Sequence, residues 1–258
     1  MSGVLGGRTV LVTGGSRGIG AATVRALHAD GAHVVLHYGS GEAAARAVAA
    51  DLGDRVSLVR GDLSTPGGGD AVWDAAVDAA VVEGTGRLDV LVNNAGAWLA
   101  SPLDDSGAWA AGWDANLTLN LRSAADLCRA AILHFRSHAA DRRGGIVVTV
   151  ASRSSHRGDD AEHLAYGAAK GGLLALTKGI ARGYAREGVL AYAVAPGWVA
   201  TDIAASAGPG LAERAAALPL GEITPPEEVA AVIAFLASGR ARHTTGATID
   251  ITGADYVR

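Results

Sequence analysis

The amino-acid sequence predicts an α/β fold, in which a parallel β-sheet is covered by helices. Short apolar runs rich in β-branched residues alternate with helical patterns along the chain, as expected of consecutive βαβ units. A glycine-rich turn joins the first run to the first helix, and small polar residues follow the ends of later runs. With 258 residues, of which 49% are hydrophobic, the chain can bury one large core, and no repeat or linker divides it. We therefore expect a single domain over residues 1–258.

The first half of the chain predicts a nucleotide-binding βαβαβ unit. Its turn, Gly14-Gly15-Ser16-Arg17-Gly18-Ile19-Gly20, lies between a strand and a helix. Glycines there let the backbone approach a pyrophosphate, whose charge the amides of the helix N-terminus hold. Asp62 follows the third strand, where the adenine of a bound nucleotide would lie, although it could instead simply cap a turn. Strands are expected at residues 8–13, 33–38 and 56–61, with one helix ending near residue 30 and another at 42–52.

The second half adds four strands and three long helices. Asn93-Asn94-Ala95-Gly96 follow the fourth strand, at the kind of strand end where ligands bind. Thr224 precedes Pro225 and stands three residues before Glu227, so it is expected to cap the last long helix. The stretch at about 198–223 is rich in small residues and is expected to form a substrate lid. Strands are expected at residues 88–92, 146–151, 189–195 and 247–251, and helices at about 105–138, 166–186 and 225–238.

Tyr166 and Lys170 form a candidate acid/base pair. Four residues apart on a helix, they lie on nearly one face, which brings the ammonium group within a few ångströms of the phenol. A nearby cation favours phenolate, so we expect it to lower the pKa of Tyr166 from its ordinary value of about 10. Ser152 directly follows the fifth strand, and its hydroxyl group is expected to face the same cleft.

Composition excludes several classes of function. A net charge of −4 and a pI near 6.0 provide no basic field for nucleic acid or an anionic membrane, so the expected partner is a small molecule. No apolar run reaches membrane-spanning length, and a cytoplasmic protein is expected. His134 and His138 lack a third ligand, so no metal site is expected. The lone Cys128 is expected to be a buried apolar side chain.

The motifs together resemble the short-chain dehydrogenase/reductase family over essentially the whole chain. They are Thr13-Gly14-x-x-x-Gly18-Ile19-Gly20, Asn93-Asn94-Ala95-Gly96, Ser152, Tyr166-x-x-x-Lys170 and Pro196-Gly197-x-x-x-Thr201, in the family's order. The resemblance implies a Rossmann fold with a doubly wound, seven-stranded parallel sheet and helices on both faces. It also implies a nicotinamide dinucleotide that exchanges hydride with a carbonyl or carbinol carbon.

The resemblance also implies roles for individual residues. Tyr166 would be the proton donor in reduction, Ser152 would hydrogen-bond the substrate oxygen, and Lys170 would hold the ribose hydroxyls. The Ser152 to Tyr166 spacing is one residue longer than is commonest in the family, and Ser154 and Ser155 lie nearby. The family's relay-water asparagine matches Asn120 better than Asn116, counting from Trp113. The implied cofactor-binding residues are Gly14, Ser16, Arg17, Gly18, Ile19, Gly20, Tyr38, Asp62, Leu63, Asn94, Ala95, Gly96, Tyr166, Lys170, Pro196, Gly197, Val199 and Thr201.

The end of the second strand predicts a preference for NADP(H) over NAD(H). An acidic residue normally binds the ribose 2′-hydroxyl of NAD there, but this chain has Tyr38 in that region. Arg17 can supply a positive partner for a 2′-phosphate. Two alternatives stay open, because Arg17 could face solvent and Glu42 could reach the ribose.

The charged loop 153–163 beside the expected cleft favours a small polar or cyclic substrate, although it could be an ordinary solvated loop. Alternative functions are an NAD-dependent sugar or polyol dehydrogenase, a 3-oxoacyl thioester reductase, an epimerase or dehydratase, and a non-catalytic dinucleotide-binding regulator. A homotetramer built from the two long helices is expected from the family and from small residues on those helices. These residues are Ala124, Ala125, Ala168, Gly172, Ala175 and Gly179.

Overall fold

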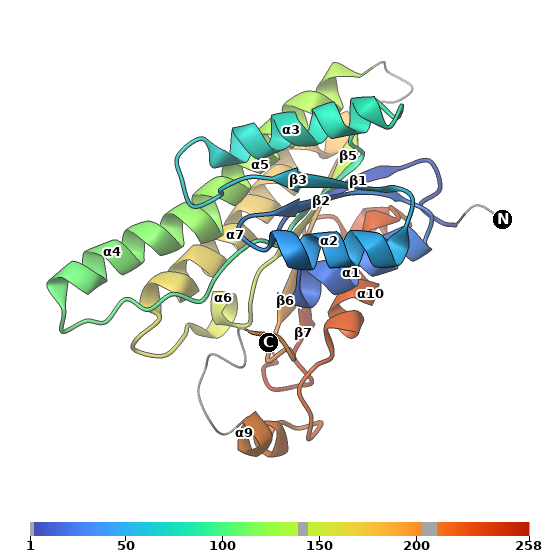
Figure 1. Cartoon of the computed structure of the whole chain (residues 1–258). Coiled ribbons are helices and arrows are strands. Elements are labelled where there is room, and N and C mark those ends of the chain that lie inside the picture. The colour runs from blue at the N-terminus through green and yellow to red at the C-terminus, as the bar shows by residue number, and fades with distance from the viewer. Residues whose placement is uncertain (1–2, 139–143, 203–210, 258) are drawn as a thin grey trace.

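A seven-stranded parallel sheet forms the centre of the molecule, as predicted (Figure 1). The computed structural model describes residues 3–138, 144–202 and 211–257. The strand order is β3-β2-β1-β4-β5-β6-β7, so the order reverses between β1 and β4, where open α/β sheets bind their ligands. The strands are β1 (Thr9–Val12), β2 (His33–Tyr38), β3 (Val56–Arg60), β4 (Val90–Asn93), β5 (Gly145–Val150), β6 (Val189–Pro196) and β7 (Thr248–Ile251).

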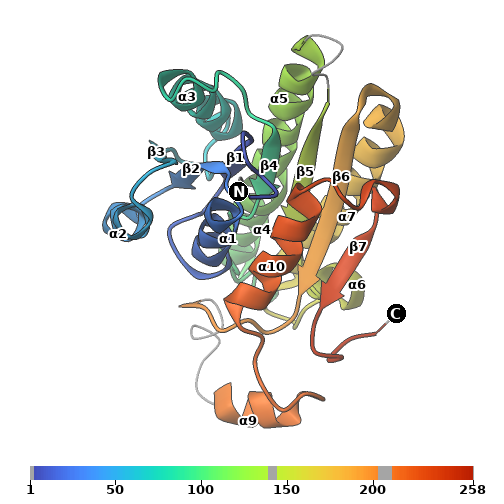
Figure 2. The ribbon, with the colours of Figure 1, turned by 90° about the vertical axis from the view of Figure 1, so that its right-hand side faces the viewer.

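Helices cover both faces of the sheet (Figure 2). The buried side chains of α1, α2 and α10 pack with one face, and those of α3, α5 and α7 pack with the other. The helices are α1 (Gly18–Ala29), α2 (Glu42–Leu52), α3 (Gly68–Val82), α4 (Ser106–Leu117), α5 (Ser123–Ser137), α6 (Ser154–Arg157), α7 (Leu164–Tyr184), α9 (Leu211–Ala217) and α10 (Pro226–Ala237). Shorter turns are the π-helix η1 (Thr118–Arg122) and the 3₁₀ helices η3 (Ala185–Glu187) and η4 (Arg242–Thr244).

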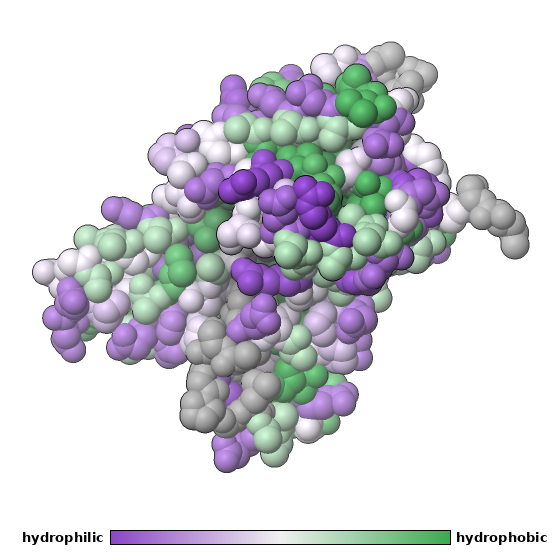
Figure 3. Space-filling model, viewed as in Figure 1, coloured by the Kyte–Doolittle hydropathy of each residue, from purple (hydrophilic) through white to green (hydrophobic). Residues whose placement is uncertain are grey.

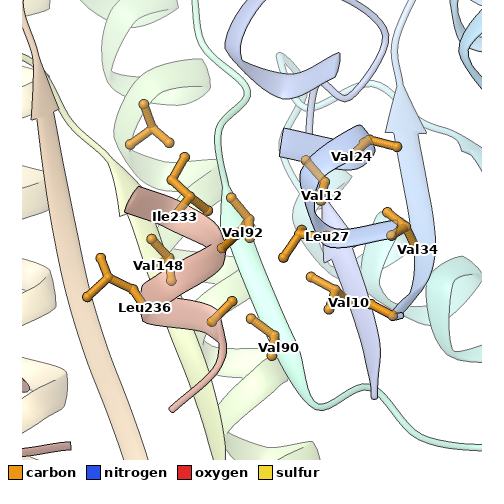
Figure 4. Close-up of a cluster of buried hydrophobic side chains, with 14 of the residues drawn as sticks. Val10, Val12, Val24, Leu27, Val34, Val90, Val92, Val148, Ile233 and Leu236 are labelled. Carbon is orange, nitrogen blue, oxygen red and sulfur yellow. The ribbon is translucent and has the colours of Figure 1, made fainter. Parts of the chain in front are cut away.

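Alternate residues of the central strands fill two separate cores. Val10 and Val12 of β1 point into the α1 and α10 side, whereas Leu11 packs against α3 and α5. Figure 4 shows the first core, where α10 places Ile233 and Leu236 near the strand valines. Each fully buried side chain of this size contributes about 1.5–3 kcal/mol relative to an exposed one. This double core fixes the sheet as a rigid platform for the loops at its carboxyl edge.

The helix expected over residues 105–138 is interrupted. The turn η1 joins α4 to α5, and in it the Ser123 N–H bonds to the Thr118 carbonyl oxygen, five residues back. The Ser123 hydroxyl also donates to the Leu119 carbonyl oxygen (2.7 Å). Such π-turns are frequent at functional sites, and this one carries Asn120.

The start of α10 differs from the prediction. Pro225 is its N-cap, and no side chain caps the helix. Thr224 instead forms a parallel bridge with Val199, and its N–H bonds to the Trp198 carbonyl oxygen (3.0 Å). The bridge ties the segment after β6 to the segment before α10.

The surface is mixed in character. On the face shown in Figure 3, exposed hydrophobic residues are scattered among polar ones and do not form one continuous patch. Within the described residues, no helix combines the length and the apolar character needed to span a bilayer.

Candidate active site

A cavity of about 1070 Å³ lies along the carboxyl edge of the sheet. Its walls come from the segments that follow β1 to β6, and residues of α7 and α9 complete it. All the predicted cofactor-binding residues except Tyr38 line this cavity, and so does Ser152. The sequence motifs, which lie far apart in the chain, are therefore brought to one site.

The glycine turn forms one wall of the cavity and leaves the N-terminus of α1 open. Gly14 has a φ of +65°, which a side chain would disfavour, and a Cβ at Gly20 would lie 2.1 Å from the Gly14 carbonyl oxygen. No side chain caps the first amides of α1. These amides and the helix dipole suit a phosphate group, so the cradle fits the pyrophosphate of a dinucleotide.

Hydrogen bonds lock the Asn93-Asn94-Ala95-Gly96 segment to the glycine turn. The Thr13 hydroxyl oxygen accepts from the backbone N–H groups of Asn94 and Ala95 (3.0 Å each). The Asn94 side chain donates to the carbonyl oxygens of Thr13 and Gly14 (2.9 and 3.2 Å). The two motifs thus form one rigid floor between β1 and β4.

Ser152, Tyr166 and Lys170 meet at the other end of the cavity. The Lys170 Nζ lies 5.8 Å from the centre of the Tyr166 ring and donates to the Val150 carbonyl oxygen (2.9 Å). Lys170 is buried, with 4% of its surface exposed, and Tyr166 is half-buried. The Ser152 side chain lies close enough to the Tyr166 hydroxyl to favour its ionised form, and its Oγ accepts from the Ser154 N–H (3.1 Å). A substrate oxygen placed in this part of the cavity can therefore contact both hydroxyl groups.

The expected lowering of the Tyr166 pKa is not found. Burial raises the pKa of Tyr166 to about 12, the charge of Asp159 adds to this rise, and the Ser152 hydroxyl and the Arg153 cation oppose it only in part. Burial also lowers the pKa of Lys170 to about 8. Tyr166 is thus held as a protonated phenol at neutral pH, which is the form that donates a proton in reduction.

The three serines near the end of β5 have different partners. The Ser154 hydroxyl donates to Asp159 (2.7 Å), and Ser155 Oγ accepts from the Ser152 N–H (3.2 Å) and does not line the cavity. Ser152 lines the cavity and reaches Tyr166. The segment between Ser152 and Tyr166, which contains α6, accommodates the spacing that is one residue longer than is commonest in the family. The geometry favours Ser152 as the serine of this site.

A family model described as enoyl-(acyl carrier protein) reductase matches residues 14–253. The chain belongs to the short-chain dehydrogenase/reductase family. It is therefore an oxidoreductase of that family. The fold agrees, because the whole seven-stranded sheet belongs to a chain that matches solved structures with TM-scores of 0.86 over 98–99% of its length.

The curated relatives act on chemically different substrates. The chain is 37% identical to 3beta-hydroxysteroid dehydrogenase 1 from Eggerthella lenta, over 96% of this chain and 94% of the relative. It is 38% identical to cis-4-hydroxycyclohexanecarboxylate dehydrogenase from Sinomonas cyclohexanicum, over 95% of both chains. Acetoacetyl-CoA and 3-oxoacyl-[acyl-carrier-protein] reductases at 33–35% identity are also among its relatives.

Among solved structures, the chain resembles the angucycline C-6 ketoreductase LanV with bound NADP. The TM-score is 0.86 at 31% identity, and the match covers 98% of this chain and 97% of LanV. Two further similar structures, each 34% identical, hold NADP and NADPH.

Asn120, the family-implied relay residue, lies behind the cavity wall. Its side chain donates to the Ala97 carbonyl oxygen (2.9 Å) and to Asn116 (3.0 Å), and its oxygen accepts from the Ala97 N–H (3.0 Å). A Cβ at Gly96 would lie 2.6 Å from Asn120 Oδ1 and 3.3 Å from Lys170 Nζ. Asn120 therefore supports the segment beside Lys170, and its side chain does not line the cavity.

At the adenosine end, the structure corrects the prediction for Tyr38. The Tyr38 side chain is buried in the core with α1 and α2, and its neighbour His37 lines the cavity. The His37 Nδ1 accepts from the Gly14 N–H (3.2 Å), and burial lowers the pKa of His37. Glu42 pairs with Arg46 on α2 (2.8 Å) and does not line the cavity.

For Arg17 and Asp62 the sequence left two interpretations open, and the structure has features of both. Arg17 is 71% exposed and pairs loosely with Asp202 (3.6 Å), yet it lines the cavity. Asp62 also lines the cavity while its carboxylate accepts from the Ser64 N–H and hydroxyl (2.9 and 2.6 Å). These hydrogen bonds lower the pKa of Asp62.

Sequence reasoning missed several polar residues that line the cavity. Arg60, the last residue of β3, is exposed at the adenosine end and lies opposite Tyr38 in the sheet register. At the substrate end, Trp98 stacks on His163 (3.6 Å between ring centres). The guanidinium groups of Arg153 and Arg214 lie over the Trp198 ring, at 4.8 and 4.7 Å. Only the charge of the loop 153–163 signalled part of this arrangement.

The predicted lid falls partly outside the described residues. Of the stretch 198–223, residues 203–210 are not described. Helix α9 lies within the described part, and its Arg214 lines the cavity. Within the described residues, no three histidine, cysteine or acidic side chains gather as a metal site.

Proposed function

We propose that this protein is an NADP(H)-dependent oxidoreductase that interconverts a small cyclic or polar ketone and its secondary alcohol. The observation that supports it is the meeting of Ser152, Tyr166 and Lys170 in the cavity that also contains the open N-terminus of α1. The cofactor, when bound, exchanges a hydride with the substrate carbon. Ser152 hydrogen-bonds the carbonyl oxygen, Tyr166 donates its phenolic proton to that oxygen, and Lys170 holds the ribose hydroxyls.

Three features support the choice of NADP(H). No carboxylate lines the cavity at the end of β2, and the carboxylate of Glu42 is paired with Arg46. Arg17 and Arg60 line the adenosine end, where a 2′-phosphate needs charged donors. Three similar solved structures contain NADP or NADPH.

The relatives support a cyclic substrate, because those that act on a steroid and on a hydroxycyclohexane are 37–38% identical. The 3-oxoacyl reductases among the relatives favour a second candidate, the reduction of a 3-oxoacyl thioester. The charged side chains at the substrate end suit a polar ketone better than a long acyl chain.

The test is turnover of a panel of ketones and alcohols with NADPH and NADH, followed by nicotinamide absorbance. The panel includes cyclic ketones, compact polar ketones and 3-oxoacyl thioesters. Reduction of cyclic or compact polar ketones with a higher kcat/KM for NADPH is expected. Efficient reduction of long 3-oxoacyl thioesters alone would replace this function by the second candidate, and absence of all turnover would reject both.

We also propose a homotetramer assembled through the long helices. Ala168, Ala175 and Gly179 lie exposed on α7, where small side chains permit close approach of a second copy. Gly172, by contrast, packs within the chain, since a Cβ there would lie 2.8 Å from Leu121. Light scattering at micromolar concentration tests this proposal, and a monomeric mass would contradict it.

A further inference from the structure

Two arginines lie on one side of the cavity at its substrate end. Arg153 directly follows Ser152, and the Arg157 N–H bonds to the Arg153 carbonyl oxygen (3.2 Å) across the α6 turn. Residues four apart on a helical turn are neighbours, and both of these line the cavity. Like charges at this spacing repel each other, so the pair is a natural place for an anion.

Three carboxylates lie around this pair, and two of them, Asp159 and Asp160, also line the cavity. Arg153 forms an ion pair with Asp255 of the C-terminal tail and lies against Trp198. Asp159 accepts from the Ser154 hydroxyl (2.7 Å) and from the Asp160 N–H (2.9 Å). Asp160 is engaged in turn by His163 (2.7 Å).

Arg157 differs from its neighbours because it forms no ion pair with any residue that the structure describes. Arg157 is exposed to the cavity and keeps its guanidinium donors for a ligand. Burial, and next the charge of Arg157, lower the pKa of Arg153 to about 10, and the charge of Asp159 opposes this lowering in part.

We propose that Arg157 is a specificity-determining residue that binds a carboxylate of the substrate while the substrate carbonyl faces Ser152 and Tyr166. This inference rests on the proposed function and names its substrate class, a carboxylate-bearing cyclic ketone or alcohol. A guanidinium matches a carboxylate with two parallel hydrogen bonds. Arg153 is already held by Asp255 and Trp198, so Arg157 makes the contact with the carboxylate.

The kinetic test compares 4-oxocyclohexanecarboxylate with its neutral primary amide, using NADPH. We expect kcat/KM to be about tenfold or more higher for the carboxylate, as for a hydrogen bond to a charged group. Arg157→Gln should remove this preference by lowering kcat/KM mainly for the carboxylate, and Arg157→Lys should keep part of it. Arg186→Gln is the matched control, because Arg186 is also exposed but lies outside the cavity.

A binding test keeps the inference separate from turnover. Cyclohexanecarboxylate has no ketone to reduce, and its affinity for the complex of enzyme and NADP⁺ is measured by calorimetry. Arg157→Gln should weaken binding about tenfold or more, and Arg186→Gln should not change it. If no ketone is reduced but this binding depends on Arg157, the proposed function fails and the anion site stands. Equal turnover of acid and amide, or acid binding unaffected in Arg157→Gln, overturns the inference.

Discussion

Lys170 is a buried cation whose charge lowers the stability of the cofactor-free protein. Its Nζ donates to the Val150 carbonyl oxygen, and it forms no ion pair with a described carboxylate. Burial lowers its pKa from 10.5 to about 8. Between these values the unfolded chain binds a proton that the folded protein does not, so the free energy of unfolding rises with pH in this window. The two pKa values correspond to about 3 kcal/mol of unfolding free energy. The protein has this contribution above pH 10.5 and lacks it below pH 8.

Lys170→Met should therefore stabilise the protein at pH 7 while abolishing turnover. Removing the charge raises the free energy of unfolding by about 3 kcal/mol, and losing the hydrogen bond to Val150 lowers it by about 1 kcal/mol. The net increase is about 2 kcal/mol. For a chain of this size the gain raises Tm by about 4–8 °C. Urea denaturation and thermal scans of the cofactor-free protein measure both quantities.

The only other lysine provides the control. Lys178 is exposed on the same helix, so Lys178→Met should stay within about 0.5 kcal/mol of wild type. Wild-type stability should approach that of Lys170→Met as the pH rises from 8 to 10.5. A Lys170→Met protein less stable than wild type at pH 7, or a wild-type stability curve that does not rise in this window, would refute the reasoning.

Three further predictions concern catalysis and cofactor choice. Tyr166→Phe should lower kcat at least about a hundredfold with little change in dinucleotide affinity, because it removes only the proton donor; a variant with more than about a tenth of the wild-type rate would show that Tyr166 is not the acid. Asn120→Ala should reduce turnover more than Asn116→Ala, since Asn120 forms both hydrogen bonds to Ala97 beside Lys170; steady-state rates at matched stability decide this, and a wild-type rate in Asn120→Ala contradicts it. Replacing Arg17 or Arg60 with Ala should lower kcat/KM about tenfold for NADPH and little for NADH; an unmoved ratio in both variants counts against NADP recognition there.

The sequence predicts the strands well because their apolar runs end at glycines and polar residues. It does not show which residues of a fully buried strand face the ligand. All six residues of β2 are buried, so no alternation of polar and apolar side chains reveals that His37 lines the cavity and Tyr38 faces the core. The sequence therefore led to Tyr38 as a cavity residue, whereas the structure places its neighbour His37 there.

Other differences come from contacts that local patterns do not contain. Helix α3 was not predicted, because it starts with glycines, which have poor helix propensity. Thr224 has the local sequence pattern of an N-cap, but its backbone pairs with Val199 in a parallel bridge and Pro225 is the N-cap of α10. Arg60 enters the site only through the pairing of β3 with β2, and the π-turn that carries Asn120 leaves no sequence signal that we recognise.

The site concentrates features that a bound dinucleotide would relieve together. The first amides of α1 lack a side-chain cap, and Lys170 holds its charge without a carboxylate in the described structure. A phosphate would accept hydrogen bonds from the α1 amides, and ribose hydroxyls would solvate the Lys170 ammonium group. Binding at a concentration one hundred times Kd stabilises a protein by about 2.7 kcal/mol.

Cofactor binding and the charge of Lys170 should therefore be coupled. NADP⁺ should raise the Tm of wild type and of Lys178→Met by similar amounts at the same concentration. It should raise the Tm of Lys170→Met less, because that variant has lost the ribose contact and has no buried charge left to relieve. Thermal scans with and without NADP⁺ measure the three shifts. Equal shifts in all three proteins would mean that the dinucleotide binds without engaging Lys170, and the role proposed for this residue would then have to be abandoned.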